Sequence, residues 1–288
     1  MPGGLVITPS GLVVLAEPHN NRVRWLYPDG TSTTVGGEPG FCDGPRGIGR
    51  FRSPRGVAVT EDGAVIVADT GNHAIRRIDV EGTVTTVAGG IAGFADGTGA
   101  KARFFGPAAV AVADTGTVVV ADTVNNMVRR IGSDGEVSDL AGSMYGQGDI
   151  GAGRPSFRRP DSVAAGGDGT IYVADTGNHR VCRIEPSGRV TLVAGRPNGN
   201  LTDGSGEPAG FHWPTGLSVA PDGTLYLADS GNETVRRIST AGVITTIDGD
   251  SRWRPIATGV FGDGRILVAE SRWGPIVPAA RLRTLGPS

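Results

Sequence analysis

Residues 160–196 carry the sequence PDSVAAGGDGTIYVADTGNHRVCRIEPSGRVTLVAGR, and most of the chain repeats it. Five further copies, weaker at the two ends, occupy residues 2–38, 54–90, 107–143, 214–250 and 255–288. Each copy begins with a proline, and successive prolines lie 52, 53, 53, 54 and 41 residues apart. Self-similarity at about this period indicates an array in which each unit buries its faces against its neighbours.

Within one copy the apolar residues follow the two-residue period of a β-strand. Four short runs rich in β-branched residues occupy 163–165, 171–174, 181–184 and 190–194. They are separated by Gly-Asp-Gly, Asp-Thr-Gly-Asn-His and Pro-Ser-Gly, which are typical turn sequences. Four antiparallel strands in each of six copies predict an all-β fold, a six-bladed β-propeller. An open solenoid is the alternative.

The repeats span residues 1–288 and therefore predict a single domain, although the length of 288 residues alone favours two. The first copy has four candidate strands of its own, at 5–7, 12–16, 22–26 and 32–35. The last copy can supply four between about 256 and 285. We therefore expect the ring to close by side-chain packing, without a terminal strand shared between the first and last blades.

Composition and charge restrict the kinds of partner and the cellular location that we expect. The chain has 27 Lys and Arg against 29 Asp and Glu, for a net charge of −2, and only one lysine, which suggests a GC-rich source. The charge predicts no steering field for nucleic acid. No apolar run is long enough to cross a membrane, and no signal segment precedes the first strand. We expect a cytoplasmic monomer with two unpaired cysteines, Cys42 and Cys182.

Several residues recur in every copy and are best explained by structure. An acid closes the second strand of each copy, and we expect it to cap the following turn; these acids are Glu17, Asp69, Asp122, Asp175, Asp229 and Glu270. His73 and His179 share a register with Asn21 and Asn126, which favours a hydrogen-bonding turn residue over a ligand or catalyst. The pairs Arg76-Arg77, Arg129-Arg130 and Arg236-Arg237 are interpreted as solvated strand edges.

The bridges between copies also repeat. A phenylalanine stands three residues before the proline that opens each complete copy after the first, and we expect it to fill a seam between blades. An Asp-Gly pair lies earlier in the bridges, as at Asp43, Asp96 and Asp203, and is expected to cap a turn.

These motifs resemble the NHL repeat family. The resemblance rests on VADTGNH at 67–73 and 173–179 and on GFADGTGAKARF at 93–104. It implies a six-bladed propeller and does not by itself imply one function, since a shared fold hosts unrelated activities. Members of the family include protein- and RNA-binding modules, sensor domains of receptor kinases, and the amidating lyase that cleaves peptidyl-hydroxyglycine.

The resemblance also predicts no metal or other cofactor here. The amidating lyase holds zinc with three histidines, two of them near the proline that opens an inner strand, and only His212 lies comparably in this chain. Gluconolactonase-like propellers hold a divalent cation with Glu, Asn and Asp of the inner strands. The expected inner strands here contain none of these residue types; they are 57–59, 110–112, 163–165 and 217–219.

Function is expected where the copies differ around their opening proline. Two residues before it stand Arg52, Phe105, Arg158, His212 and Trp253, and directly before it Ser53, Gly106, Arg159, Trp213 and Arg254. Directly after it stand Arg55, Ala108, Asp161, Thr215 and Ile256. Because the framing residues stay constant while these vary, we expect them at the mouth of the ring; the alternative is that half of them point outward along the rim.

Two functions follow from this mouth. In the first, the propeller binds a small anionic or aromatic ligand, or a peptide or protein partner, since guanidinium groups pair with carboxylate or phosphate and indoles stack on planar groups. The candidate binding residues are Arg52, Arg55, Phe105, Arg158, Trp213, Thr215 and Trp253. In the alternative, the chain is a metal-independent lyase, hydrolase or isomerase. His212 is then its general acid or base, Asp161 the second proton-transfer group, and the arginines a clamp.

Overall fold

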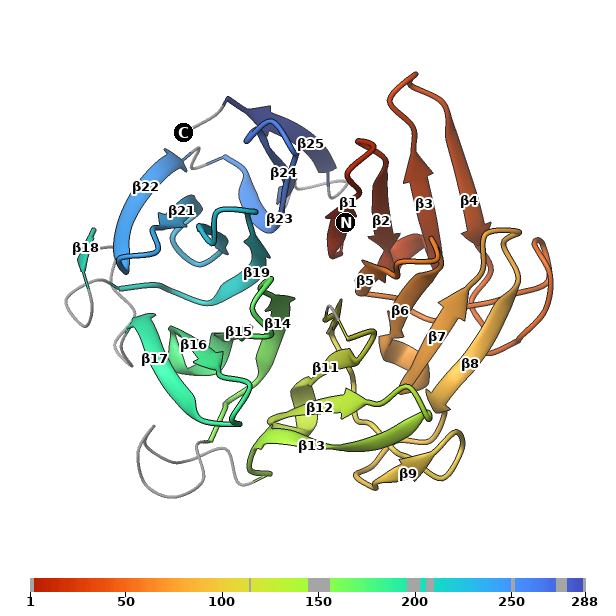
Figure 1. Cartoon of the computed structure of the whole chain (residues 1–288). Helices are drawn as coiled ribbons and strands as arrows, with labels where there is room; N and C mark the ends of the chain where they lie inside the picture. Colours follow the sequence, from red (N-terminus) through yellow and green to blue (C-terminus); the bar gives the residue numbers. More distant parts are fainter. Residues whose placement is uncertain are drawn as a thin grey trace.

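Six antiparallel sheets surround a central axis in the computed structural model of the chain (Figure 1). The structure describes residues 3–113, 115–144, 156–195, 203–205, 210–249, 252–272 and 279–286. The sheets follow one another in chain order, and each is packed against the next, so the predicted six-bladed β-propeller is confirmed.

The first five blades each have four strands in sequential order. Blade 1 contains β1 (Leu5–Ile7), β2 (Val13–Glu17), β3 (Arg22–Leu26) and β4 (Ser32–Gly36). Blade 2 contains β5 (Gly56–Val59), β6 (Val65–Asp69), β7 (Ala74–Ile78) and β8 (Val84–Gly89). Blade 3 contains β10 (Ala109–Val112), β11 (Val118–Asp122), β12 (Met127–Ile131) and β13 (Glu136–Gly142).

Blade 4 contains β14 (Pro160–Ala165), β15 (Ile171–Asp175), β16 (Arg180–Ile184) and β17 (Val190–Gly195). Blade 5 contains β19 (Pro214–Val219), β20 (Leu225–Asp229), β21 (Thr234–Ile238) and β22 (Val243–Gly249). Two short strands from the bridges, β9 (Gly97–Thr98) and β18 (Gly204–Ser205), add to the outer edges of blades 3 and 5. A 3-10 turn joins the second and third strands of blades 1 to 4; these turns are η1 (Pro18–Asn20), η2 (Thr70–Asn72), η3 (Thr123–Asn125) and η4 (Thr176–Asn178).

The sixth blade differs from the expectation of four strands. Its described residues form three: β23 (Arg254–Val260), β24 (Ile266–Arg272) and β25 (Ala279–Leu285). The decayed copy lacks the Asp-Thr-Gly-Asn turn, so β24 continues past Glu270 to Arg272. Two seven-residue strands thus occupy most of the span in which three short ones were expected.

The ring closes between blades 6 and 1 by packing, as expected. In the described part of the chain no strand of one pairs with a strand of the other. Instead β23 lies against β1, and a Cβ built on Gly259 would stand 2.3 Å from the Leu5 Cδ1 atom. A larger residue at position 259 would therefore have to displace the Leu5 side chain, which packs directly on Gly259.

The core lies between the blades, because each blade is covered on both faces. One cluster joins Val14 and Val23 of blade 1 to Val57 and Val67 of blade 2, around the buried side chain of Phe51. The equivalent phenylalanines of the next bridges are Phe104, Phe157 and Phe211, and each is fully buried in the next seam. Their predicted role as seam fillers is confirmed.

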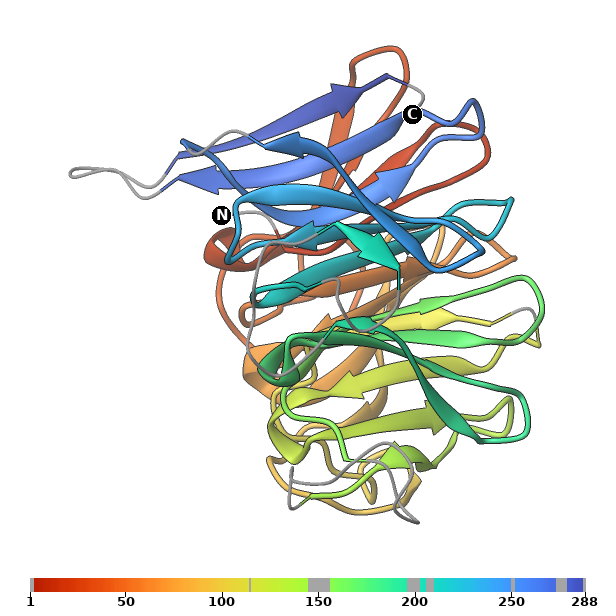
Figure 2. The same cartoon turned by 90° about the vertical axis from the view of Figure 1, so that its left-hand side faces the viewer.

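The two ends of the ring carry different connections (Figure 2). The bridges and the turns between second and third strands lie at one end, which we call the bridge face. The hairpins between first and second and between third and fourth strands lie at the other, which we call the hairpin face. Antiparallel order within every blade imposes this separation.

Candidate functional site

The recurrent aspartate of blades 2 to 5 holds three segments together. In blade 2 the Asp69 Oδ1 atom accepts the backbone N–H of Arg52 at 2.8 Å. Its Oδ2 atom accepts the Asn72 amide and the Arg76 guanidinium, each at 2.8 Å. Burial raises the pKa of Asp69, against the opposing effect of these donors. The acid therefore does more than cap a turn, because it also joins the bridge to the third strand.

The interpretation of the paired arginines as solvated edges is wrong for the first member of each pair. The side chains of Arg76, Arg129 and Arg236 are fully buried. The third strand is covered by the fourth strand and by the neighbouring blades, so it is not an edge. Burying a guanidinium is costly unless it is paired, and Arg76 pairs with Asp69 and with Asp43 of the bridge, the latter at 2.6 Å.

The Asp-Gly acids of the bridges were expected to cap turns, and the described ones instead neutralise these arginines. Asp43 also accepts the Thr86 backbone N–H at 3.0 Å. Asp96 pairs in the same way with Arg129, and Asp203 with Arg236 at 2.7 Å. The bridges before blades 2, 3 and 5 are thereby fastened to the outer half of those blades.

His73 and His179 are hydrogen-bonding turn residues, as their exchange with asparagine predicted. The Nδ1 atom of His179 accepts the backbone N–H of Trp213 at 3.1 Å, and Asn126 Oδ1 accepts that of Arg159 at 2.9 Å. His179 has a φ of 56°, in the left-handed region that asparagine tolerates. Burial lowers the pKa of His179, with smaller contributions from His212 and Arg158.

In blades 2 to 5 the residue two positions before the proline is held over the turn of its own blade. Besides the bond from its N–H to Asp229, His212 accepts the Gly231 backbone N–H at 2.7 Å on its carbonyl. A Cβ on Gly231 would stand 2.4 Å from that carbonyl oxygen, so a larger residue would push it away; at the equivalent position of blade 3, Val124 makes the same bond at 3.1 Å. This clamp keeps the position on the rim of the bridge face, outside the cavity described next.

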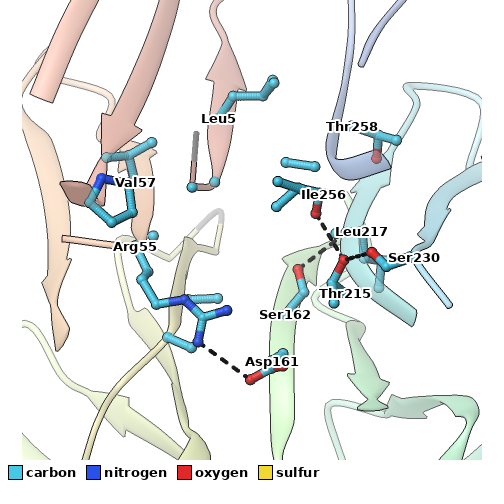
Figure 3. A pocket seen from close by; sticks show the side chains of 18 of the residues that line it. Leu5, Arg55, Val57, Asp161, Ser162, Thr215, Leu217, Ser230, Ile256 and Thr258 are labelled. Carbon is cyan, nitrogen blue, oxygen red and sulfur yellow. Dashed lines mark hydrogen bonds and ion pairs between the residues drawn. The ribbon is translucent and has the colours of Figure 1, made fainter. Parts of the chain in front are cut away.

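A cavity of about 460 Å³ opens on the axis at the bridge end of the ring (Figure 3). Residues at the start of the inner strand of every blade line it. The inner strands approach closely because small residues separate them: a Cβ on Gly56 would stand 2.6 Å from the Ala109 Cα atom. Leu5, Val57 and Leu217 contribute apolar walls.

An ion pair spans this cavity between blades that are not neighbours. Arg55 of blade 2 directs its Nη1 atom to Asp161 Oδ1 of blade 4 at 3.7 Å (Figure 3). The Arg55 side chain is 40% exposed, whereas that of Asp161 is 8% exposed. Hydroxyl groups lie beside Asp161: Leu217 N–H donates to Ser162 Oγ at 3.2 Å, and Thr215 Oγ1 donates to the Ile256 carbonyl at 3.0 Å.

The structure separates the predicted residues into two groups. Arg55, Asp161 and Thr215 line the cavity together. Arg52, Phe105, Arg158 and Trp213 are exposed on the rim and are not among the residues that line the cavity.

Two further predicted residues lie away from the axis. His212 is half-buried, with its ring 5.3 Å from that of His179. Trp253 packs under the Arg281 guanidinium, 4.3 Å from the ring centroid. Neither lines the cavity, so the structure does not place His212 beside Asp161, its proposed partner in acid–base chemistry.

Sequence reasoning missed several lining residues. His19, Ser162, Ser230 and Thr258 belong to the lining but were not candidates. Ser230 occupies the register of the recurrent turn threonines and donates to the Pro255 carbonyl, so its pattern indicates structure alone. The position after each proline was the sequence signal for the lining. Most other lining residues belong to the inner strands, whereas His19 and Ser230 belong to turns between second and third strands.

Charged groups occupy both faces of the ring. Acids on the hairpin-face turns pair with arginines, as Asp62 does with Arg77 and Asp263 with Arg265. The bridge face carries both exposed acids and exposed arginines; they are Asp43, Asp96, Asp203, Arg52, Arg158, Arg159 and Arg254. Among the described lining residues of the cavity, Arg55 and Arg254 accompany one acid, Asp161, which leaves a small local excess of positive charge that favours anions there.

A second hollow, of about 730 Å³, lies at the hairpin end, lined by Asp168, Tyr172, Val219 and Val260 among others. Among the described residues no three His, Cys, Asp or Glu side chains are grouped as a metal site. No described helix is long and apolar enough to span a membrane.

The fold and the repeated Asp–Asn–Arg contacts define a class, the six-bladed repeat propellers. The model of the NHL repeat matches residues 51–78, 157–184 and 211–238, each of which runs from a seam phenylalanine or the residue beside it to the end of a third strand. The chain therefore contains NHL repeats on a six-bladed propeller.

Relatives and solved structures agree with this assignment. NHL repeat-containing protein 2 of Gallus gallus is 30% identical over 284 residues, covering 91% of this chain and 33% of the relative. The chain spans about a third or less of the curated relatives that it matches.

Two solved enzymes share the fold. An inactive virginiamycin B lyase of Staphylococcus aureus with quinupristin has a TM-score of 0.62 at 17% identity, covering 97% of this chain and 83% of that one. A gluconolactonase of Xanthomonas campestris has a TM-score of 0.66 at 17% identity, covering 98% and 86%. At these identities the likeness concerns the fold alone.

Proposed function

We propose that this propeller binds a small organic anion with an apolar body in the cavity at its bridge face. The observation that carries the proposal is the Arg55–Asp161 pair across a cavity with otherwise largely apolar or hydroxyl-bearing walls. Arg55 is 40% exposed, so the guanidinium has donors free to face a ligand carboxylate or phosphate.

The walls suit a ligand that is mostly apolar. Leu5, Val57, Val110, Leu217 and Ile256 surround the pair, and a volume of about 460 Å³ lies in the range of small-molecule sites. A peptide or protein partner could insert one acidic side chain at the same place. We favour a small molecule because the inner strands of all six blades enclose the cavity.

The charged and aromatic residues on the rim favour capture of an anionic ligand. Arg52, Arg158, Arg159 and Arg254 place positive charge around the mouth, and Phe105 and Trp213 are 41% and 38% exposed beside it. Charge of one sign at the entrance of a cleft concentrates ligands of the opposite sign. The enzyme alternative relies on His212, which stands on this rim and not in the cavity, so binding is the function that we propose.

Two further proposals accompany this one. The cavity is complete within one ring, which supports a monomer as the working unit. Cys42 and Cys182 are both free, which supports a reducing compartment such as the cytoplasm.

The test is a panel of small carboxylates with aliphatic and aromatic bodies, each compared with its uncharged amide by thermal shift and isothermal titration calorimetry. At least one carboxylate should bind more tightly than its amide and lose about tenfold or more in affinity in Arg55→Gln, since a hydrogen bond to a charged group contributes about 1.5–3 kcal/mol.

The matched control is Arg77→Gln. Arg77 is a comparably exposed arginine that pairs with Asp62 of a hairpin-face turn, far from the mouth. The proposal fails if no carboxylate in the panel binds better than its amide, or if the two arginine variants lose affinity equally.

A further inference from the structure

Asp161 stands out among the buried carboxylates of the ring. Its Oδ1 atom is buried and has no hydrogen-bond partner among the described residues. The recurrent acids are satisfied by contrast: Asp69, Asp175 and Asp229 each accept a backbone N–H on one oxygen and side-chain donors on the other. Within the protein, Asp161 Oδ1 therefore remains available as an acceptor for a donor in the cavity that Asp161 lines.

Arg55 does not satisfy this oxygen. The 3.7 Å between Arg55 Nη1 and Asp161 Oδ1 exceeds hydrogen-bonding distance. Ala108 occupies the same register in blade 3, between the two, and its small side chain leaves space for a ligand there. The cavity therefore presents the N–H donors of the Arg55 guanidinium beside Asp161 Oδ1, an acceptor that makes no hydrogen bond within the described residues.

We infer that the ligand is an α-amino acid with an apolar side chain, a deduction that rests on the proposed function. Its carboxylate pairs with Arg55, and its ammonium group donates to Asp161 Oδ1. Opposite charges on neighbouring protein groups match a ligand whose ammonium and carboxylate are attached to the same carbon, as in an α-amino acid, and not one whose charges lie at the ends of a long chain.

The surroundings fit the remaining parts of such a ligand. An ammonium group has three donors, and the oxygens of Ser162 and Thr215 lie beside Asp161 (Figure 3). An apolar side chain would contact Leu5, Val57 and Ile256 on the opposite wall. No second carboxylate lines the cavity among the described residues, so Asp161 is the specific acceptor for the cation.

The experiment compares each amino acid with the same molecule lacking its amino group. L-leucine is titrated against 4-methylpentanoate, L-valine against 3-methylbutanoate, and L-phenylalanine against 3-phenylpropanoate, by calorimetry with the intact protein. We expect at least one amino acid to bind about tenfold or more tightly than its partner, and 6-aminohexanoate, whose charges lie far apart, to bind weakly.

Asp161→Asn should remove the advantage of the amino group and leave the binding of the des-amino acid nearly unchanged. The wild-type comparison stands even if this variant does not fold. If the des-amino acids bind as tightly as the amino acids, the inference is overturned while the proposed anion site survives. If neither series binds, the inference is overturned as well, and the wider carboxylate panel decides the proposed function separately.

Discussion

Replacement of Arg76 by methionine tests the buried ion pairs that hold each blade together. The Arg76 guanidinium donates to Asp69 at 2.8 Å, to Asp43 at 2.6 Å and to the carbonyls of Arg50 and Cys42 at 3.0 and 2.8 Å. Methionine fills much of the same volume but leaves Asp69 buried without its cation. Removing one partner of a buried pair costs about 3–5 kcal/mol. At about 2–4 °C per kcal/mol for a chain of this size, Tm should fall on the order of 10 °C.

The assay is urea unfolding and calorimetry of Arg76→Met beside Arg77→Met. Arg77 follows in the same strand, but it is partly exposed and pairs only with exposed Asp62, so its loss should cost under about 1 kcal/mol. Adding Asp69→Asn to Arg76→Met should recover part of the loss, because the uncompensated charge disappears. Equal losses in the two single variants, or a loss below 1 kcal/mol in Arg76→Met, would refute the reasoning.

Three further outcomes are expected. Burial raises the pKa of Asp122 to about 6 from an ordinary value near 3.8, so on acidification the folded state takes up a proton before the unfolded chain does. Between pH 7.5 and 5, urea titrations should therefore show wild type gaining stability relative to Asp122→Asn. Parallel pH profiles of the two proteins would contradict this. His179→Asn should stay within about 0.5 kcal/mol of wild type, since asparagine accepts the same backbone bond elsewhere. His179→Leu removes the acceptor of the exposed Trp213 N–H and should cost about 0.5–1.5 kcal/mol. Similar losses in both variants would argue against the turn role. Thr176→Val removes the hydroxyl that donates to the Pro214 carbonyl at 2.6 Å, and it should lower the free energy of unfolding by about 1–2 kcal/mol. An unchanged free energy would show that this hydrogen bond between blades contributes little.

The sequence was sufficient for the blades because each copy repeats its own turn and strand pattern. The prolines, seam phenylalanines and His–Asn exchange all predicted roles that the structure confirms. The burial of Arg76 could not be predicted from the two-residue period, because that period does not reveal that neighbouring blades cover both faces of the strand. The described residues of blade 6 form three strands where four were expected, because the decayed copy lacks the turn that marks the others.

The site was predicted in part. Residues directly after the opening proline do line the cavity, as Arg55 and Asp161 show. Residues two positions before it, such as Arg52 and His212, are instead clamped over the turn of their own blade. The difference depends on hydrogen bonds between segments that no linear pattern displays. The Arg55–Asp161 pair joins residues 106 positions apart and exists only because the ring closes.

Methyl NMR of the protein labelled at valine and leucine tests the central claim most directly, through titration with the tightest-binding carboxylate of the panel. The account predicts that shift changes concentrate on Val57, Val110 and Leu217, which line the bridge-face cavity. It is contradicted if the changes instead concentrate on Val219 and Val260 at the hairpin end, or on the outer strands.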